Sequence, residues 1–497
     1  MNVAIVGAGF SGIAMGMALK RDGVEDFTIF ERGPDLGGVW RANHYPGSAC
    51  DVPSYLYSYK GEQRRDWTRP CSPQQEILGY LHDVADKNGV APRIRTDTEI
   101  ASAEFDPDAG RWSLRTTTGE EHHADALVVA CGQLSRPSWP SIPGRDDFEG
   151  HSFHSAEWDH DYDLAGKRVA VVGTGASAVQ FVPPVAEDVA QLDVYQRSPP
   201  WMLPRSNQEY PRWGRWLLKH VPGLQALRRR YLLAVMESTI LGLTKVPPLR
   251  WLLGAWAQAF MRMQVRDPEL RRKVWPDYPI GCKRVLFSSH YLPALQRPNV
   301  EVVTDSIERI TPAGVVAGGR ERAVDCIVWG TGFRASDFVV PMRVTGRKGR
   351  ELQDVWSGGA EAHLGITVAG FPSMYLLYGP NTNLGVGSIV EMIEAQVRYV
   401  SGALAATRAE GAPLDLRPEV QRWSGDLVQD RLRNSIWTAC DNWYRQDGEG
   451  RVVNNWPGFM AEYRRLTREF DRSEYAVASE EWDQGTAATT TRATPTA

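Results

Sequence analysis

The chain has 497 residues, of which 42% are hydrophobic and 23% charged, and its formal net charge is −4. This length exceeds what one compact core accommodates and predicts two or three domains, while the near-neutral charge argues against nucleic acid as the main partner. The sequence contains no run of about 18 apolar residues, so no membrane-spanning helix is predicted. Glycines interrupt the first apolar run and no basic residue precedes it, so the N-terminus predicts a buried strand rather than an export signal. We therefore expect a cytoplasmic protein without a membrane span.

The cysteine pattern argues against a metal site and against a dithiol redox centre. The cysteines are Cys50, Cys71, Cys131, Cys282, Cys326 and Cys440. They contain no Cys-x-x-Cys pair and do not cluster with histidine. We expect reduced structural thiols and no metal ion, and flavin-dependent disulfide reductases, which need such a pair, are disfavoured.

A dinucleotide-binding motif opens the chain. The apolar residues 3–6 predict a strand, and a turn with glycines at Gly7, Gly9 and Gly12 leads into a helical pattern. Gly7 permits the turn, Gly9 lets the backbone approach a pyrophosphate, and Gly12 lets the helix pack on the strand. The next strand ends in Glu31, the acid expected to bind a ribose hydroxyl.

Two loops follow this motif. The first, residues 32–40, is rich in glycine and suits the large cofactor FAD; it contains Gly38 and Trp40. The second is turn-rich, ends in Tyr57 and contains the single acid Asp51. Asp51 is interpreted either as a solvated turn residue or as a carboxylate beside a flavin ring, and the local sequence does not choose between them. Beyond these loops we expect a helix over 72–90, strands over 98–130 and a proline-rich linker over 135–144.

A second dinucleotide-binding motif begins at residue 168. An apolar strand is followed by Gly173-Thr174-Gly175-Ala176-Ser177-Ala178 and then by a helical pattern, and alanine is permitted at the third small position. The following strand ends in Gln196-Arg197-Ser198 instead of an acid. Arg197 and Ser198 suit a 2′-phosphate, which favours NADPH over NADH; the alternative is a surface arginine. The cofactors expected from the two motifs together are FAD and NADPH.

The sequence from 205 to 280 is helical, rich in Trp and Arg, and interrupts the α/β pattern. We expect this insert to pack on the domain that carries it and to cover the substrate; a location on a membrane surface remains the alternative. Later, an apolar strand and glycine turn over 325–333 should return the chain to the first domain. A helix is expected from Ser388 to about Leu404, with Glu391 on its surface rather than at the substrate.

These elements predict an α/β protein with two Rossmann-like dinucleotide-binding domains and a helical insertion in the second. The first part of the FAD-binding domain spans 1–140, the NADPH-binding domain spans 148–325, and the second part of the FAD-binding domain spans 326–480. The Thr- and Ala-rich tail, 485–497, should be disordered.

The stretch between the two motifs carries a family resemblance. Its pattern Phe148-x-Gly150-x-x-x-His154-x-x-x-Trp158-Asp159 resembles the fingerprint of type I Baeyer-Villiger monooxygenases. The sister flavin-containing monooxygenases usually end this fingerprint in tyrosine instead of Trp158-Asp159. The segment from Gly38 to Asp51 and the pair Lys283-Arg284 also match the family, and the resemblance extends from residue 2 to about 470.

The resemblance implies an enzyme that forms a C4a-peroxyflavin from O2 and converts a ketone to an ester or lactone. It implies that Arg284 stabilises negative charge, that Asp51 holds Arg284, and that Lys283 joins the NADPH phosphate site. His154 would couple the two domains and position the nicotinamide cofactor without acting as an acid or base. The substrate is expected to be a small hydrophobic ketone; the oligomeric state is not predicted.

Two alternatives stay open at this point. One is an N- or S-oxygenating flavin-containing monooxygenase on the same scaffold. The other is a flavoprotein that acts as a redox sensor or NADPH oxidase without an organic substrate. Trp158-Asp159 and the Asp51 and Arg284 pair favour the Baeyer-Villiger enzyme over the first, and Arg284 argues against the second.

Overall fold

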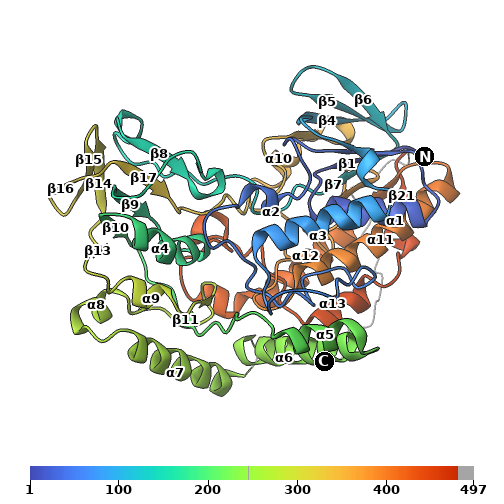
Figure 1. Cartoon of the computed structure of the whole chain (residues 1–497). Helices are drawn as coiled ribbons and strands as arrows, with labels where there is room; N and C mark the ends of the chain where they lie inside the picture. Colours follow the sequence, from blue (N-terminus) through green and yellow to red (C-terminus); the bar gives the residue numbers. More distant parts are fainter. Residues whose placement is uncertain (245, 480–497) are drawn as a thin grey trace.

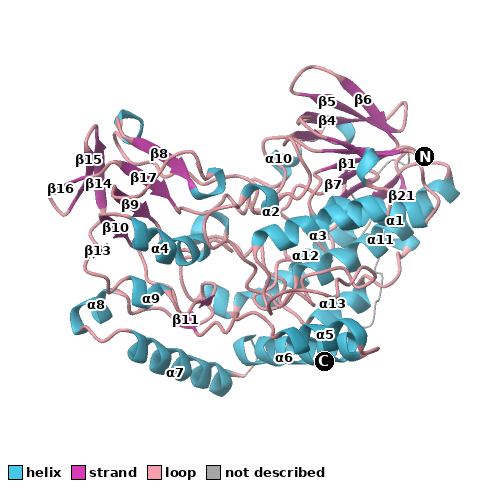
Figure 2. Ribbon diagram, in the orientation of Figure 1, coloured by secondary structure: helices cyan, strands magenta, loops and turns pink. Residues whose placement is uncertain are grey.

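A computed structural model describes residues 1–244 and 246–479. Two lobes, each built on a parallel sheet, stand side by side, and a row of helices runs along one edge across both (Figures 1 and 2). The predicted tail, 485–497, lies outside the described residues.

The first lobe is built on a five-stranded parallel sheet in the order β19-β7-β1-β2-β3. Its strands are β1 (Val3–Val6), β2 (Phe27–Phe30), β3 (Ile94–Arg95), β7 (Ala126–Val129) and β19 (Met374–Leu376). All four residues of β1 are buried, because the sheet is covered on both faces. Ile5 faces one core and Ala4 the other, as the alternation along a strand requires.

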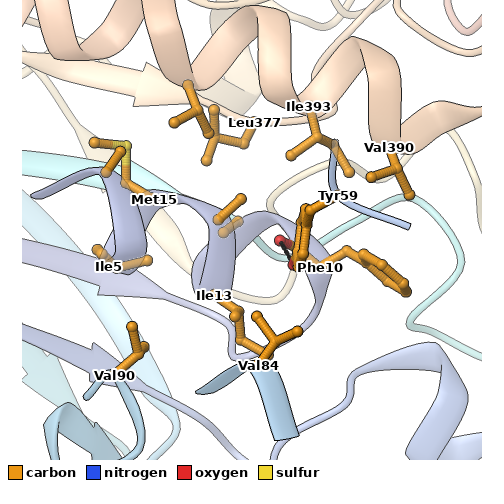
Figure 3. Close-up of a cluster of buried hydrophobic side chains, with 14 of the residues drawn as sticks. Ile5, Phe10, Ile13, Met15, Tyr59, Val84, Val90, Leu377, Val390 and Ile393 are labelled. Carbon is orange, nitrogen blue, oxygen red and sulfur yellow. Dashed lines mark hydrogen bonds between the residues drawn. The ribbon is translucent and has the colours of Figure 1, made fainter. Parts of the chain in front are cut away.

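Helices cover one face of this sheet. They are α1 (Phe10–Arg21), α3 (Gln74–Lys87) and α11 (Ile389–Glu410), with the short α2 (Val39–Ala42) nearby. Figure 3 shows α1 between two layers: Val84 lies on one side of it, and Val390 and Ile393 of α11 lie on the other. The hydroxyl of Tyr59 donates to the carbonyl of Phe10 at 2.6 Å, which fixes the start of α1.

The opposite face is covered by a smaller sheet in the order β18-β4-β5-β6. Its strands are β4 (Ile100–Asp106), β5 (Arg111–Thr116), β6 (Glu121–Ala124) and β18 (Arg343–Thr345). The C-terminal part of this lobe contains α10 (Leu352–Val355), α12 (Pro418–Arg433), α13 (Met460–Leu466), β20 (Leu414–Leu416) and β21 (Tyr475–Val477). The short 3-10 helices of the chain are η1 (Ala91–Arg93), η2 (Arg145–Asp147), η3 (Ser155–Glu157), η4 (Arg347–Gly349), η5 (Ile436–Thr438), η6 (Gln446–Gly448) and η7 (Arg472–Glu474).

The second lobe repeats this plan with the parallel order β13-β10-β9-β17-β8. Its strands are β8 (His151–His154), β9 (Arg168–Val172), β10 (Gln191–Tyr195), β13 (Val300–Val303) and β17 (Cys326–Trp329), accompanied by α4 (Ala176–Asp188) and α9 (Tyr291–Ala294). An antiparallel sheet of β14 (Ile307–Thr311), β15 (Gly314–Ala317) and β16 (Arg320–Ala323) adjoins it. The two repeated units confirm the predicted α/β fold. The boundary at 325/326 is wrong by one strand, because β17 pairs with β9 and β8 in the second sheet.

The insert consists of α5 (Arg212–His220), α6 (Leu224–Thr244), α7 (Pro247–Gln264) and α8 (Pro268–Lys273), and the parallel strands β11 (Met202–Leu203) and β12 (Leu286–Phe287) close its base. The prediction that it packs on its own domain holds for α7, whose Phe260 and Met261 belong to the core of the second lobe. It is wrong for α5 and α6, since Leu218 and Leu232 pack against the core of the first lobe. The insert therefore bridges both lobes.

Within residues 1–244 and 246–479, no helix combines the length and apolar character needed to cross a bilayer. The same residues contain no group of three or more His, Cys, Asp or Glu side chains suited to hold a metal ion.

Candidate active site

The turn between β1 and α1 has the shape of a dinucleotide cradle. Gly7 has φ +107°, and a Cβ on it would lie 2.6 Å from the carbonyl oxygen of Ala130. A Cβ on Gly12 would lie 1.9 Å from the oxygen of Gly7, and one on Gly38 would lie 3.1 Å from Cα of Gly9. Side chains are therefore excluded where the two glycine-rich loops meet, as the close approach of a pyrophosphate requires. These residues fit FAD.

Glu31 is held at the end of β2 beside this turn. Its side chain accepts hydrogen bonds from the backbone N–H of Ala8 at 2.9 Å and of Gly33 at 3.0 Å, and Arg41 lies 3.6 Å away. Only 5% of Glu31 is exposed. The carboxylate is thus oriented at the position where the ribose of a dinucleotide lies in this fold.

Trp40 and Tyr57 lie together over the start of α1. The indole N–H of Trp40 donates to the hydroxyl of Tyr57 at 3.2 Å, and the ring of Tyr57 meets Phe10 edge-on at 5.0 Å. Burial raises the pKa of Tyr57 far above its ordinary value. The two side chains form one aromatic wall next to the first glycine turn.

The second cradle repeats the geometry of the first. Gly173 has φ +109°, and a Cβ on it would lie 2.4 Å from the oxygen of Gly330, which follows β17 as Ala130 follows β7. Gly175 caps the N-terminus of α4, and a Cβ there would meet no atom within 4 Å. Ser177 and Ala178 lie in the first turn of α4. The open helix N-terminus suits a pyrophosphate, so these residues fit NADP.

Basic side chains gather at the end of β10. Lys283 Nζ lies 3.0 Å from the hydroxyl of Ser198, and burial together with the nearby charge of Arg197 lowers the pKa of Lys283. Arg197 also lines a cavity of about 450 Å³ with Arg272 and Lys273. Sequence reasoning predicted Lys283, Ser198 and Arg197 for this site, and the structure brings these three residues together.

Asp51 and Arg284 form an ion pair between the two lobes although 233 residues separate them. The Oδ2 atom of Asp51 accepts from Nε of Arg284 at 3.1 Å and from Nη2 at 2.6 Å. Burial opposes ionisation of Asp51, but the charge and hydrogen bonds of Arg284 hold the pKa of its carboxyl below the ordinary value. The Asp51 charge in turn raises the pKa of Arg284. The pair is therefore fully ionised, and the solvated-turn interpretation of Asp51 does not describe its contacts.

Two tyrosines lie beside this pair. Burial raises the pKa of Tyr444 to about 12; the charge of Arg284 opposes this rise and the charge of Asp51 adds to it. Burial also raises the pKa of Tyr378, whose hydroxyl donates to Asn383 at 2.8 Å, and the charge of Arg284 opposes part of this rise. Sequence reasoning assigned no role to either residue, because both lie in C-terminal turns without a recognisable motif.

The loop that carries Asp51 is clamped by the second lobe. Gln180 of α4 accepts from the N–H of Ala49 at 3.1 Å and donates to the carbonyl of Ala49 at 2.9 Å. Arg205 donates to the carbonyl of Cys50, and its charge also lowers the pKa of Asp51. Sequence reasoning missed Gln180 and Arg205. Only their positions in the sequence could have indicated them: Gln180 follows the second glycine motif, and Arg205 begins the insert.

His154 is fully buried at the end of β8. Its Nδ1 accepts from the N–H of Ala156 at 3.1 Å, which caps η3, and burial lowers its pKa to about 4. Trp158 packs edge-on against Phe153 at 5.1 Å, in the core of the second lobe. The fingerprint thus orders the connection between the lobes, and His154 is a neutral side chain in it.

The expectation of six reduced thiols is wrong for two of them. Cys282 and Cys440 form a disulfide, with Cα atoms 6.2 Å apart. Their side chains meet because 282 lies at the end of the insert and 440 after α12, an adjacency that sequence spacing cannot reveal. The bond anchors the segment that continues into Lys283 and Arg284. The other four cysteines are free.

The expectation that Glu391 lies on a helix surface is also wrong. It is 6% exposed and pairs with Arg229 of α6 and, at 3.1 Å, with Arg464 of α13. Arg229 is itself 8% exposed and also donates to the carbonyls of Tyr55 and Ser58. Burial without these partners would be prohibitive for either charge, so the contact links the insert to the first turn of α11.

Known proteins resemble the chain over nearly its whole length. A Baeyer-Villiger monooxygenase of Pseudomonas aeruginosa is 45% identical over 482 residues, covering 96% of this chain and 92% of the relative. One of Streptomyces coelicolor is 43% identical with the same coverage. The profile of the pyridine nucleotide-disulphide oxidoreductase family matches residues 4–213.

Solved structures agree with these relatives. An oxidized steroid monooxygenase bound to NADP superposes with a TM-score of 0.86 at 32% identity and covers 96% of this chain and 99% of its own. A cyclohexanone monooxygenase from Rhodococcus sp. Phi1 bound to NADP+ has a TM-score of 0.85 at 27% identity and covers 94% and 96%. Two nucleotide cradles and an ionised Asp51–Arg284 pair between the lobes fit these relatives. Identity and coverage of this extent place the chain in the family of Baeyer-Villiger monooxygenases, which are NADPH-dependent flavin enzymes.

Proposed function

We propose that this enzyme inserts an oxygen atom from O2 beside the carbonyl of a small hydrophobic ketone, with Arg284 as the residue that stabilises the developing negative charge. The observation that carries the proposal is the ion pair of Asp51 with Arg284 at 2.6 Å between the two nucleotide-binding lobes. The reaction class and the cofactors predicted from the sequence, FAD and NADPH, agree with family membership and are confirmed.

We assign cofactor contacts by fit. FAD would be held by Gly7, Gly9, Gly12, Glu31, Gly38, Trp40, Asp51 and Tyr57, and NADPH by Gly173, Gly175, Ser177, Ala178, Arg197, Ser198 and Lys283, with His154 as a buried coupling residue between the lobes. The support is the exclusion of side chains at both glycine turns and the Lys283–Ser198 contact, which offers a cation and a hydroxyl to a 2′-phosphate.

When bound, FAD reduced by NADPH supplies the activation of O2. The protein's contribution is electrostatic: a carbonyl under attack gains negative charge on its oxygen, and a fixed cation lowers the energy of that state. Asp51 occupies Nε and one Nη2 hydrogen of Arg284, which leaves three of the five guanidinium N–H groups for the reacting atoms. Gln180 and Arg205 restrain the Asp51 loop, so Arg284 needs little reorganisation during the reaction.

The proposal of a hydrophobic ketone rests on the surroundings of Arg284. The apolar cluster that contains Cys282, Trp437 and Tyr444 lies next to the segment that carries it. Two structural neighbours are named as a steroid monooxygenase and a cyclohexanone monooxygenase, and both names denote apolar ring compounds. The cytoplasmic location stays a prediction, and the Cys282–Cys440 bond makes it worth testing, since disulfides are rare in reducing compartments.

The test supplies the flavin-loaded enzyme with NADPH, O2 and a panel of cyclic, aryl-alkyl and linear ketones, amines and sulfides. Esters or lactones from apolar ketones are the expected products. Amine or sulfide oxides without esters would assign the chain to heteroatom oxygenation, and NADPH consumption with only hydrogen peroxide would assign it to an oxidase. Esters formed only from polar, charged ketones would contradict the proposed substrate class.

A further inference from the structure

The insert carries most of the exposed large hydrophobic side chains of the described residues. Among the described residues, fifteen large hydrophobic side chains are exposed, and eleven of them lie between residues 213 and 263. They are Trp213, Trp216, Val221, Leu227, Tyr231, Val235, Leu249, Trp251, Leu252, Trp256 and Met263. Trp251 keeps 71% and Met263 73% of its accessible surface. Single exposed apolar residues are ordinary, but such a concentration marks an interaction surface.

These side chains form stripes on the outer sides of α6 and α7. On α6 the exposed residues Leu227, Tyr231 and Val235 recur every four positions and so share one face. The buried Arg229 lies off this stripe and contacts the first lobe. One side of α6 therefore packs on the first lobe, while the opposite side is exposed and also apolar.

The same two-sided pattern holds for α7. Its exposed Leu252, Trp256 and Met263 follow helical spacing, while Phe260 and Met261 pack in the core of the second lobe. A helix that is apolar on both sides is ordinarily buried on both. Helices α5, α6 and α7 lie along one edge of the molecule (Figure 1), so their outer sides can meet a single extended surface.

The charge of this segment indicates what that surface is. Residues 210–264 contain nine Lys and Arg and a single acid, Glu237, a formal charge of +8 in a chain whose net charge is −4. Arg212, Lys219, Arg230 and Arg262 are exposed among the apolar side chains. A second copy that met this face with its own insert would bring like charges together, which opposes symmetric pairing. An anionic lipid surface complements both the charge and the apolar stripes.

We propose that α5, α6 and α7 dock the enzyme on the surface of an anionic lipid bilayer. The helix axes lie in the plane of the membrane, the Trp and Leu side chains enter the boundary between headgroups and acyl chains, and the Arg and Lys side chains contact lipid phosphates. Trp at this depth and basic residues beside it are the composition of helices that lie on membranes without crossing them. Because α6 is anchored to the first lobe through Arg229, docking holds the flavin-binding lobe at the membrane.

Sedimentation with vesicles tests this with the full-length, flavin-loaded enzyme. Wild-type protein is expected to bind vesicles of phosphatidylcholine with about 30% phosphatidylglycerol, to bind pure phosphatidylcholine at least about tenfold more weakly, and to be released by salt. Replacing Arg212 and Lys219 together by Gln should weaken binding about 30-fold. Replacing Trp213 and Trp251 together by Ser should weaken it at least about tenfold.

Trp423→Ser is the matched control, because Trp423 is 47% exposed but lies on α12, outside the insert. It should bind as wild type does. Unchanged flavin absorbance and melting temperature show that the variants fold. The dependence of wild-type binding on lipid charge and salt tests the proposal even if a variant does not fold. The proposal is overturned if wild type ignores anionic vesicles, binds neutral ones equally, or is unaffected by either double substitution. A concentration-dependent dimer that the Trp213 and Trp251 substitutions abolish, without vesicle binding, would assign the face to a second copy instead.

Discussion

Replacement of Arg284 by alanine is the sharpest test of the assigned chemistry. The substitution removes the one cation that the structure places against Asp51 through two hydrogen bonds, at 3.1 and 2.6 Å. Asp51 keeps the nearby charge of Arg205, so the loop should stay folded. Binding of both dinucleotides should persist, because the glycine turns and the Lys283–Ser198 contact are untouched.

The expected loss is set by the donors that remain available. Three guanidinium N–H groups are left for the reacting atoms, and the side chain is 34% exposed, so water screens it partly. Removal of one preorganised donor from an oxyanion site costs about 3–4 kcal/mol, or roughly 10²–10³ in rate. We expect ester formation to fall by at least about 10² after the screening is taken into account.

The assay separates the two half-reactions. Anaerobic reduction of the flavin by NADPH, followed by absorbance in a stopped-flow instrument, should stay within about twofold of wild type. Ester yield per NADPH should collapse, with hydrogen peroxide in its place. Arg284→Lys should be intermediate, because an ammonium cannot reproduce the planar fork, and Arg309→Ala, at an exposed position on β14, is the control. Ester formation by the Arg284→Ala enzyme above a tenth of the wild-type rate would refute the role of this residue.

Three further predictions follow from buried or paired charges. Arg229→Met should lower the free energy of unfolding by about 2–3 kcal/mol. This is less than the roughly 3–5 kcal/mol lost when a buried ion pair is fully broken, because Glu391 keeps its ion pair with Arg464. A melting temperature equal to that of wild type would contradict this. Lys283→Ala should raise KM for NADPH about 10- to 100-fold and leave KM for NADH unchanged, and an equal rise for both cofactors would remove it from the 2′-phosphate site. Burial lowers the pKa of His154 to about 4 in the folded protein, below its unfolded value of about 6.5. The stability that neutral His154 provides is therefore intact above pH 6.5, and the free energy of unfolding falls by about 1.4 kcal/mol per pH unit as the pH drops toward 4. His154→Asn should flatten this part of the profile of melting temperature against pH, and an unchanged slope would argue against a buried neutral histidine.

Local sequence was sufficient for the two nucleotide cradles. At Gly7 and Gly173 the backbone takes a positive φ against a neighbouring carbonyl, a constraint that a single residue type meets and that sequence therefore displays. The same holds for Glu31, because the distance along the chain from glycine turn to acid follows from one strand-turn-helix-strand unit. The pairing of Asp51 with Arg284 was accessible through the family resemblance alone, since nothing local joins residues 233 positions apart.

What sequence reasoning missed depends on contacts between distant elements. The pattern around Glu391 is that of a helix start, and the burial of its carboxylate is explained by two distant partners, Arg229 from the insert and Arg464 from α13. The packing of α5 and α6 on the first lobe was hidden for a similar reason: their apolar residues lie on more than one side, so periodicity did not identify the covered face. The free-thiol prediction failed for Cys282 and Cys440 because, for two cysteines 158 residues apart, the spacing along the chain does not reveal their separation in space.

The Cys282–Cys440 bond gives the two lobes a third covalent connection. The chain itself crosses between the two parallel sheets twice, from β7 to β8 and from β17 to β18. The disulfide ties the end of the insert to the segment after α12. It adds to the non-covalent contacts between the lobes, those of Gln180 with the Asp51 loop and of Arg229 with the first lobe. Arg284 lies two residues along the chain from Cys282, so the bond also restrains the residue that contacts Asp51.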